Sequence, residues 1–447
     1  MVNILDENAF GLWSKIVNHV FNTLFVRIDE KQHWKLLAES LKDGKASLYI
    51  HFPFCRSFCL YCPYYREIWN KRDFEKYASA LIQEINLLSM KLKDRDFEIV
   101  DAHVGGGSPS LAPPSFWKLI IDELKSKLNL KTSLGIEANP EDLVDESKVF
   151  AMAEAGVSEI SVGGQSFCKP HLKVLGRRHG PEEVEIAIKN CRTAGFKLIN
   201  LDLMFMVPNI QGKEQLKNWG EDLTKAVQLN PDQITAYPTL ITRQCKGYKL
   251  VKAGKVNQPT RLFGSFLERT REILEGEGYK RIRIYSWSRG GEYATVNLEM
   301  VGPLLCLGPG AMGFTGSYEW CQVHSVAEYI KSINSNKPAA AVSRTVSLEE
   351  RAARLMADQL FCSGEAHEEL FKAVLGRGFD AIPKGMARGL MLMRILGWVK
   401  HEKSKIRLTQ RGFVPAHKFI WTFVLRVPCR IVEQLIENPW PERIKVP

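Results

Sequence analysis

Short β-rich runs alternate with longer segments of helical period between residues 47 and about 240, and this alternation limits the possible folds more than any other feature. The β-rich runs are residues 47–52, 99–104, 132–137, 159–162, 198–204 and 233–237. The helical segments are residues 74–92, 114–128, 147–155, 181–194 and 215–228. Strands joined by crossover helices form right-handed βαβ units and a parallel sheet. The sequence therefore predicts an α/β fold, a partial or full βα barrel whose chemistry lies at the carboxyl ends of the strands.

The length of 447 residues is enough for two or three domains. The predicted parts are a helical lead-in over 1–46, a core barrel over 47–240, a barrel extension and substrate-side region over 241–345, and a C-terminal winged-helix-like α+β domain over 346–447. In the lead-in, Leu12, Ile16, Val20 and Leu24 are four residues apart. This spacing predicts an amphipathic helix that packs on the main domain, with a membrane-surface helix as the alternative.

The C-terminal part combines helices with a predicted hairpin at 398–401 and 406–409. It carries 17 Lys and Arg against 11 Asp and Glu from residue 347 to the end. A winged helix often binds DNA, but no helix here stands out as basic. We therefore expect no nucleic-acid partner.

Charge and cysteine usage indicate the compartment and the kind of ligand. The formal net charge is +11, which suits an acidic ligand. The mean hydropathy is −0.17 and the longest apolar runs are short, so we expect no membrane span. Ten cysteines without a secretory signal indicate a cytoplasmic protein.

Three of these cysteines, Cys55, Cys59 and Cys62, lie within eight residues. Such a trio in a cytoplasmic chain is typical of a metal or redox site. Three thiolates on a [4Fe–4S] cluster leave one iron without a protein ligand, free to bind a substrate or cofactor. The alternative is a zinc site, which needs four ligands and for which His51 is the nearby candidate.

The Cys-x3-Cys-x2-Cys motif at the end of the first predicted barrel strand resembles the radical S-adenosylmethionine (SAM) superfamily. The longer string Tyr49-x-His51-x-Pro53-Phe54-Cys55 resembles one branch, the oxygen-independent coproporphyrinogen III oxidase-like proteins. Further matches to this branch follow in order at residues 105–110, 136–140, 161–167, 175–177, 200–204, 307–311 and 406–412. The resemblance covers about residues 47–415.

The resemblance implies a [4Fe–4S] cluster on Cys55, Cys59 and Cys62, with one or two SAM molecules beside it. One-electron cleavage of SAM then yields methionine and a 5′-deoxyadenosyl radical, which abstracts hydrogen. The implied SAM contacts are Tyr49, Tyr61, Gly106, Gly107, Ser108, Glu137, Gln165, Arg177, Asp202 and Ala236, with Met312 near a second SAM. Tyr61 would pack on adenine, although it also fits a core aromatic position. Each of the polar residues could equally be a satisfied structural group.

Three departures from the branch bear on the reaction. The position where the oxidase carries a further Cys is Tyr64, and the stretch 295–300 lacks the His-Asn-x-x-Tyr-Trp string of the haem chaperones. Met206 stands where a Gly is usual, which we expect to change the pocket wall. These departures favour the SAM-dependent methyltransferase and haem-utilisation subgroup, which the stretch 306–318 resembles.

Three functions follow from the resemblance. The first is methylation of a tetrapyrrole or another flat conjugated substrate, using a second SAM. The second is oxidative decarboxylation of coproporphyrinogen propionates, and the third is haem carriage without catalysis. A reduced flavodoxin or ferredoxin is the implied electron donor. His103, His171, His179 and His324 are candidate haem ligands or proton relays, but buried structural histidines are the commoner case.

Overall fold

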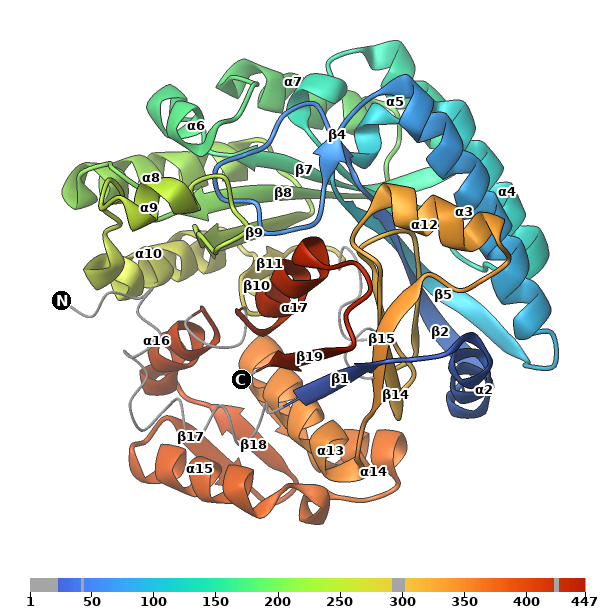
Figure 1. Ribbon diagram of the computed structural model, residues 1–447. Helices are drawn as coiled ribbons and strands as arrows, with labels where there is room; N and C mark the ends of the chain where they lie inside the picture. The colour runs from blue at the N-terminus through green and yellow to red at the C-terminus, as the bar shows by residue number, and fades with distance from the viewer. Residues whose placement is uncertain (1–22, 42–43, 292–301, 422–425, 447) are drawn as a thin grey trace.

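One curved sheet organises the molecule, and helices cover its convex side (Figure 1). The computed structural model describes residues 23–41, 44–291, 302–421 and 426–446. Within them, 14 strands join in the order β10-β11-β9-β8-β7-β6-β5-β2-β12-β13-β14-β15-β1-β19. No pairing joins β10 to β19 in this part of the chain, so the barrel is partial and the α/β prediction is confirmed.

The parallel part of the sheet contains seven strands. They are β2 (Gly44–Phe52), β5 (Phe97–Gly106), β6 (Leu134–Ala138), β7 (Val157–Gln165), β8 (Leu198–Phe205), β9 (Gln233–Pro238) and β12 (Leu304–Leu307). The antiparallel members are β1 (Thr23–Arg27), β10 (Lys280–Arg281), β11 (Ser286–Ser288), β13 (Met312–Phe314), β14 (Tyr318–Gln322), β15 (Ala340–Thr345) and β19 (Arg443–Val446). The first six parallel strands contain the six predicted β-rich runs almost entirely.

The outer helices include the five crossover connections that the sequence predicts over residues 47–240, together with two more, α6 and α10. They are α3 (Lys71–Lys91), α4 (Pro114–Leu128), α5 (Glu146–Glu154), α6 (Lys169–Leu175), α7 (Pro181–Thr193), α8 (Gly212–Gln228) and α10 (Phe263–Gly276). Other helices are α2 (Glu30–Ser40), α9 (Tyr248–Lys252), α12 (Val326–Asn334), α16 (Gln410–Phe419) and α17 (Arg426–Glu437). None of the described helices is long and apolar enough to cross a membrane.

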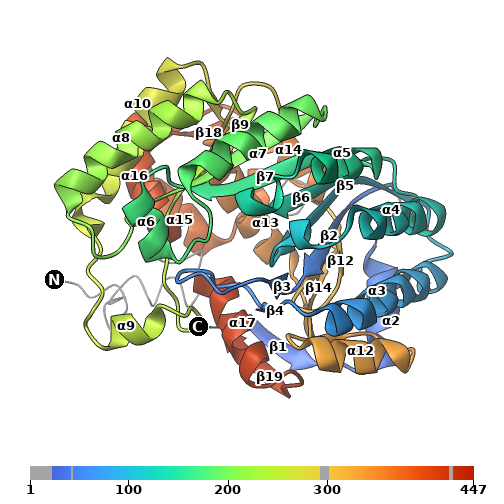
Figure 2. The same cartoon turned by 90° about the horizontal axis from the view of Figure 1, so that it is seen from above.

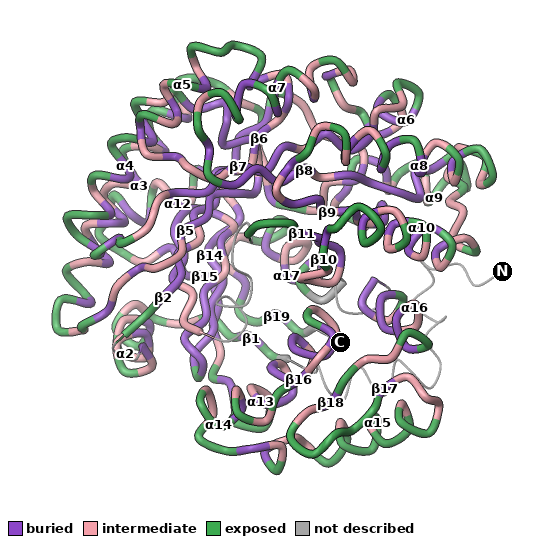
Figure 3. Tube along the Cα trace, turned by 180° about the vertical axis from the view of Figure 1, so that it is seen from behind, coloured by how far each residue is buried: buried purple, intermediate pink, exposed green. Residues whose placement is uncertain are grey.

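A smaller unit packs around its own core and has the helices and hairpin expected of a winged-helix-like module. It contains α13 (Leu348–Ala357), the π-helix η5 (Asp358–Ser363), β16 (Glu365–His367), α14 (Glu368–Leu375), α15 (Lys384–Ile395), β17 (Val399–Glu402) and β18 (Lys405–Leu408). Figure 3 shows the buried residues concentrated along the strands of the main sheet, whereas α15 is largely exposed.

Both ends of the described chain join the main sheet. Leu24 lies in β1, so the predicted helix is wrong at that residue, because strand pairing with β15 and β19 outweighs the four-residue spacing. Leu12, Ile16 and Val20 lie outside the described residues. The C-terminal α17 lies within the arc of the sheet (Figure 1), and Gln244 donates to the Cys429 carbonyl there at 3.0 Å. The division into four parts remains a prediction.

A buried carboxylate fixes the turn after β12. Glu84, on α3, accepts hydrogen bonds from the Gly308 amide (2.8 Å), the Gln322 amide (2.7 Å) and the Tyr329 hydroxyl (2.8 Å). Burial raises its pKa from 4.5 to about 7, against these three donors, which lower it. Glu84 thereby ties three segments that are distant in the sequence to one helix.

We expect Glu84→Gln to flatten part of the pH dependence of stability. The folded pKa of Glu84 lies above its unfolded value, so its contribution is complete below about pH 4.5 and is lost as the pH rises to 7. The loss amounts to about 3 kcal/mol at most. Denaturant unfolding at pH 5 and pH 8 should show a smaller decrease for the variant than for the unaltered chain. An identical decrease in both would contradict this assignment.

Candidate active site

The cysteine loop, residues 53–69, crosses the carboxyl ends of the parallel strands. Its ends are held together where β3 (Phe54–Cys55) pairs with β4 (Glu67–Ile68). At its tip, the Leu60 amide donates to the Leu175 carbonyl at 3.1 Å, and the Gly247 amide donates to the Leu60 carbonyl at 2.8 Å. The loop is therefore fixed at its base by the sheet and at its tip by α6 and the turn before α9.

The three thiols of this loop differ in burial. Cys55 is buried, whereas Cys59 and Cys62 are partly exposed, and all ten cysteines of the chain are free thiols. Burial raises the pKa of Cys55 to about 11 and that of Cys62 to about 12, with the neighbouring thiols adding to both shifts. Metal binding must displace these protons, because a thiolate is the ligand.

His51, the candidate fourth ligand for zinc, is already engaged by other groups. Both ring nitrogens of His51 are engaged, with Nδ1 3.1 Å from the Tyr49 hydroxyl and Nε2 2.9 Å from the Tyr65 carbonyl. Within the described residues, no three His, Cys, Asp or Glu side chains are placed to hold a single ion. Three thiols from one loop would supply the three protein ligands of a [4Fe–4S] cluster that keeps one iron open.

Arg177 supplies the positive charge beside these thiols. Its Nη1 donates to Cys59 Sγ at 3.4 Å, and its Nη2 donates to Asn139 Oδ1 at 2.6 Å and to the Gly163 carbonyl at 2.8 Å. Burial opposes the charge, but Tyr61, Cys59 and Glu141 outweigh it, so the pKa of Arg177 is raised. Its Nε has no partner among the described residues, so one donor remains for a bound group.

Polar side chains follow one face of the parallel strands, the face away from the outer helices. Strand pairing aligns them in a row: Tyr49 with His103, Glu137 with Ser161, Ser161 with Asn200, and Asp202 with Thr235. Side chains alternate along a strand, so these residues share the concave face. The row therefore lies in the interior of the partial barrel, below the cysteine loop.

Two carboxylates belong to the row, Glu137 near the end of β6 and Asp202 within β8. Glu137 contacts His103 Nε2 at 3.4 Å and accepts from the Gly106 amide at 3.3 Å, and its side chain remains 41% exposed. Asp202 is bonded to Ser161 Oγ (2.9 Å) and Asn200 Nδ2 (2.8 Å). Burial, reinforced by Glu137, raises the pKa of Asp202 to about 7.

Gly106, the last residue of β5, and Gly107 allow the cysteine loop to approach this strand closely. The Gly107 amide donates to the Phe52 carbonyl at 2.7 Å, and the Ser108 amide donates to the Phe54 carbonyl at 2.8 Å. A Cβ on Gly107 would lie 2.5 Å from the Phe54 carbonyl oxygen. Ser108 Oγ then reaches Cys55 Sγ at 3.6 Å. Gly106 has φ +102°, and a Cβ there would meet the His51 ring.

The remaining residues that were predicted to contact SAM differ from one another in their neighbours. Tyr61 is buried with Leu175, Met204 and Val207, and Gln165 accepts from the Tyr237 hydroxyl at 3.0 Å. Ala236 is fully buried, and its side chain lies on the opposite face from Asp202, so only its backbone could reach the interior. Met312 begins β13, directly after the turn that Glu84 holds. The structure brings Tyr49, Glu137, Arg177 and Asp202 to one interior, whereas SAM contact remains a prediction for each residue.

Met206 does not itself line this interior. It is fully buried in the main hydrophobic core and has φ +57°, a conformation that favours glycine. The following residue, Val207, packs with Tyr61. Any effect of Met206 on the pocket would therefore act through Val207.

Several interior residues escaped the sequence analysis, among them Ser161, Asn200, Thr235 and Tyr237. Their period-two spacing within strands was the available signal. The histidines His103, His171, His179 and His324 are all buried, which agrees with structural roles. The stretch 295–300 lies outside the described residues.

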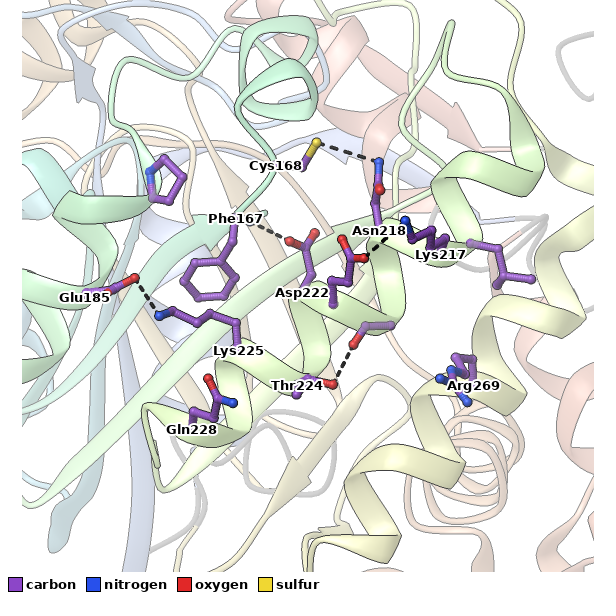
Figure 4. A pocket seen from close by; sticks show the side chains of 14 residues that line it. Phe167, Cys168, Glu185, Lys217, Asn218, Asp222, Thr224, Lys225, Gln228 and Arg269 are labelled. Carbon is purple, nitrogen blue, oxygen red and sulfur yellow. Dashed lines mark hydrogen bonds and ion pairs between the residues drawn. The ribbon is translucent and has the colours of Figure 1, made fainter.

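A surface hollow lies on the other side of the sheet, between α7, α8 and α10 (Figure 4). Four of its charges form two ion pairs, Lys225 with Glu185 at 2.9 Å and Lys217 with Glu221 at 3.7 Å. Asp222 is buried and accepts from the Phe167 amide at 2.7 Å. This hollow shares no residue with the interior row, and we assign it no chemistry.

Comparison with known proteins gives consistent results. Residues 49–217 match the Radical SAM superfamily. The chain is 30% identical to the heme chaperone HemW of Haemophilus influenzae over 60% of this chain and 70% of that protein. It is 26% identical to HemW of Bacillus subtilis, over 85% and 99%. It is 25% identical to the oxygen-independent coproporphyrinogen III oxidase of Pseudomonas aeruginosa, over 84% and 85%.

Among solved structures, the coproporphyrinogen III oxidase HemN from Escherichia coli aligns with a TM-score of 0.75 and 19% identity. The alignment covers 89% of this chain and 94% of that one. At this identity the likeness establishes the fold alone.

We expect Gly107→Ala to displace the cysteine loop. The new methyl group would collide with the carbonyl oxygens of Phe52 and Phe54, on either side of Pro53. These oxygens cannot move away without breaking the hydrogen bonds that they accept from the Gly107 and Ser108 amides. The cost should be about 2 kcal/mol or more. Gly276→Ala, at an open position in α10, is the control and should not lower stability. Equal thermal unfolding temperatures for Gly107→Ala and the unaltered chain would disprove the contact.

Proposed function

The chain belongs to the radical SAM superfamily, and from this premise we propose that it methylates a tetrapyrrole or another flat conjugated substrate. Its cofactors are a [4Fe–4S] cluster and SAM. The observation that carries the proposal is the loop of three thiols facing an interior lined by Glu137, Arg177 and Asp202. Relatives named for haem carriage and for coproporphyrinogen oxidation support a tetrapyrrole as the substrate class.

Cys55, Cys59 and Cys62 would hold the cluster. When bound, the cluster and SAM supply one-electron cleavage of SAM to a carbon radical that abstracts hydrogen. Arg177 places a fixed cation beside Cys59, which offsets the charge of the thiolates.

Glu137 and Asp202 would bind the polar groups of SAM. Glu137 is open to the interior and can accept from ribose hydroxyls or an ammonium group. Asp202 is held by Ser161 and Asn200, so its carboxyl group has a fixed orientation. Tyr61 lies in the apolar cluster beside Val207, where an adenine ring could stack.

Methyl transfer is preferred over decarboxylation because Tyr64 stands where the oxidase carries a further Cys. Haem carriage is the second candidate, favoured by the relatives named heme chaperones. A tetrapyrrole in either role carries propionates, which the net charge of +11 suits. A reduced flavodoxin or ferredoxin would supply the electron, and we place the reaction in the cytoplasm.

Product analysis separates these functions. The reconstituted chain is incubated without oxygen with SAM, dithionite and haem or coproporphyrinogen, and products are read by mass spectrometry. We expect 5′-deoxyadenosine, S-adenosylhomocysteine and a tetrapyrrole heavier by one methylene group. Loss of carboxyl groups would support decarboxylation. Bound haem without SAM cleavage would support haem carriage and disprove methylation.

Cys62→Ala should abolish the cluster. Removing one of three ligands leaves two thiolates, too few to hold the four irons as proposed. Iron content and 5′-deoxyadenosine formation should fall to background levels. Cys168→Ala changes a partly exposed thiol outside the loop and should leave both unchanged. Full iron content in Cys62→Ala would refute the ligand assignment.

A further inference from the structure

Three chain segments meet at the tip of the cysteine loop, and the charged residues of these segments are all basic. The loop itself contributes Leu60, which is bonded to Leu175 at the end of α6 and to Gly247 before α9. Figures 1 and 2 both show the loop passing between α6 and α9. A Cβ on Gly247 would lie 2.7 Å from Leu60, so close contact depends on the missing side chain.

These segments lack acidic residues, although the whole chain has 50. No Asp or Glu occurs between Asp43 and Glu67, between Glu159 and Glu182, or between Asp232 and Glu268. Two exposed basic residues of the flanking segments are paired with acids, Lys169 with Glu182 and Arg243 with Glu433. Six others form what we term the basic collar: Lys173, Arg178, Lys246, Lys249, Lys252 and Lys255. None of the six has an ion-pair partner among the described residues.

Elsewhere on the surface, lysines are commonly paired with acids on the same helix. Examples are Lys71 with Glu75, Lys118 with Asp122 and Lys217 with Glu221. Unpaired like charges repel one another and are costly to gather unless a partner of opposite charge compensates them. The collar therefore fits an acidic surface.

The collar also surrounds the outermost part of the metal-binding loop. Cys59 is partly exposed, and Gly176 lies 3.8 Å, measured from its ideal Cβ position, from the Cys59 Cα. Gly176 itself is exposed, so this part of the loop lies close to the surface. On α9, Leu250 is 41% exposed, between Lys249 and Lys252 in the sequence, and offers an apolar contact beside the lysines.

We propose that the basic collar docks a small redox protein with an acidic face, which passes one electron to the cluster through the Cys59–Leu60 segment. This inference rests on the proposed function, because only the cluster needs the electron. In the transfer the carrier is oxidised by one electron and the cluster is reduced by one, with no bond made or broken. Electron-transfer complexes of this kind are small, transient and steered by charge.

The test compares two triple variants of equal charge change. Lys246→Glu, Lys249→Glu and Lys252→Glu together reverse the collar on the α9 side. Lys76→Glu, Lys93→Glu and Lys125→Glu together are the control, on or beside α3 and α4, on the other side of the molecule (Figure 2). All six lysines are exposed. The probe is a purified flavodoxin, with a ferredoxin as a second arm.

Binding of the oxidised probe is measured by calorimetry at low salt, with and without the cluster. The collar variant should raise Kd by at least about tenfold and the control by less than about twofold. The difference should diminish at high salt, because screening weakens exposed charge pairs. Equal binding of both probes by the two variants would overturn the proposal.

Turnover distinguishes this inference from the proposed function. With flavodoxin as reductant, the collar variant should form 5′-deoxyadenosine at least about tenfold more slowly than the control. With dithionite, the two should be equal. A matching loss with dithionite, or weaker tetrapyrrole binding with unchanged flavodoxin binding, would assign the collar to substrate and refute docking. If dithionite drives no SAM cleavage in the unaltered chain, the proposed function fails, while the binding comparison still decides the collar.

Discussion

The close approach of the cysteine loop to the end of β5 is the contact on which the site depends. Backbone hydrogen bonds from Gly107 and Ser108 to the strand residues Phe52 and Phe54 leave no room for a side chain at Gly107. They direct Cys55 toward the barrel interior and bring Ser108 to its sulfur. Because the loop tip is bonded to α6 and to Gly247 as well, the positions of Cys59 and Cys62 follow from the same frame.

Electrostatic balance is the second requirement of this interior. Burial raises the pKa of the Cys55 and Cys62 thiols and of the Asp202 carboxyl group, so each of them resists ionisation. Arg177 is the cation that faces Cys59, and its own burial is offset by Tyr61, Cys59 and Glu141. A cationic cofactor head group would find its counter-charges in Glu137 and Asp202. The interior therefore suits a ligand that carries a positive charge.

Periodicity and spacing predicted much of this arrangement. Each of the six β-rich runs became a parallel strand, and Glu137 and Asp202, which lie within two of these runs, share one face of the sheet. The predictions failed where pairing is between distant segments. Leu24 is in a strand because β1 lies between β15 and β19, and Val26 pairs with Arg443. No local pattern carries that information, since the partners are more than 400 residues apart.

The sequence by itself determined the α/β class, the order of the parallel strands along the chain and the three thiols, because these depend on local periodicity and on residues close in the chain. Only the tertiary structure decided that the barrel stays open, that β12 extends its parallel part, and that Glu84 holds the turn at Gly308. It also decided that acid-free segments around Leu60, Leu175 and Gly247 form one basic surface. These features depend on contacts between segments that are far apart in the sequence. No local pattern predicts such contacts, because the burial and the electrostatic surroundings of a residue are set by its neighbours in space and not by its neighbours along the chain.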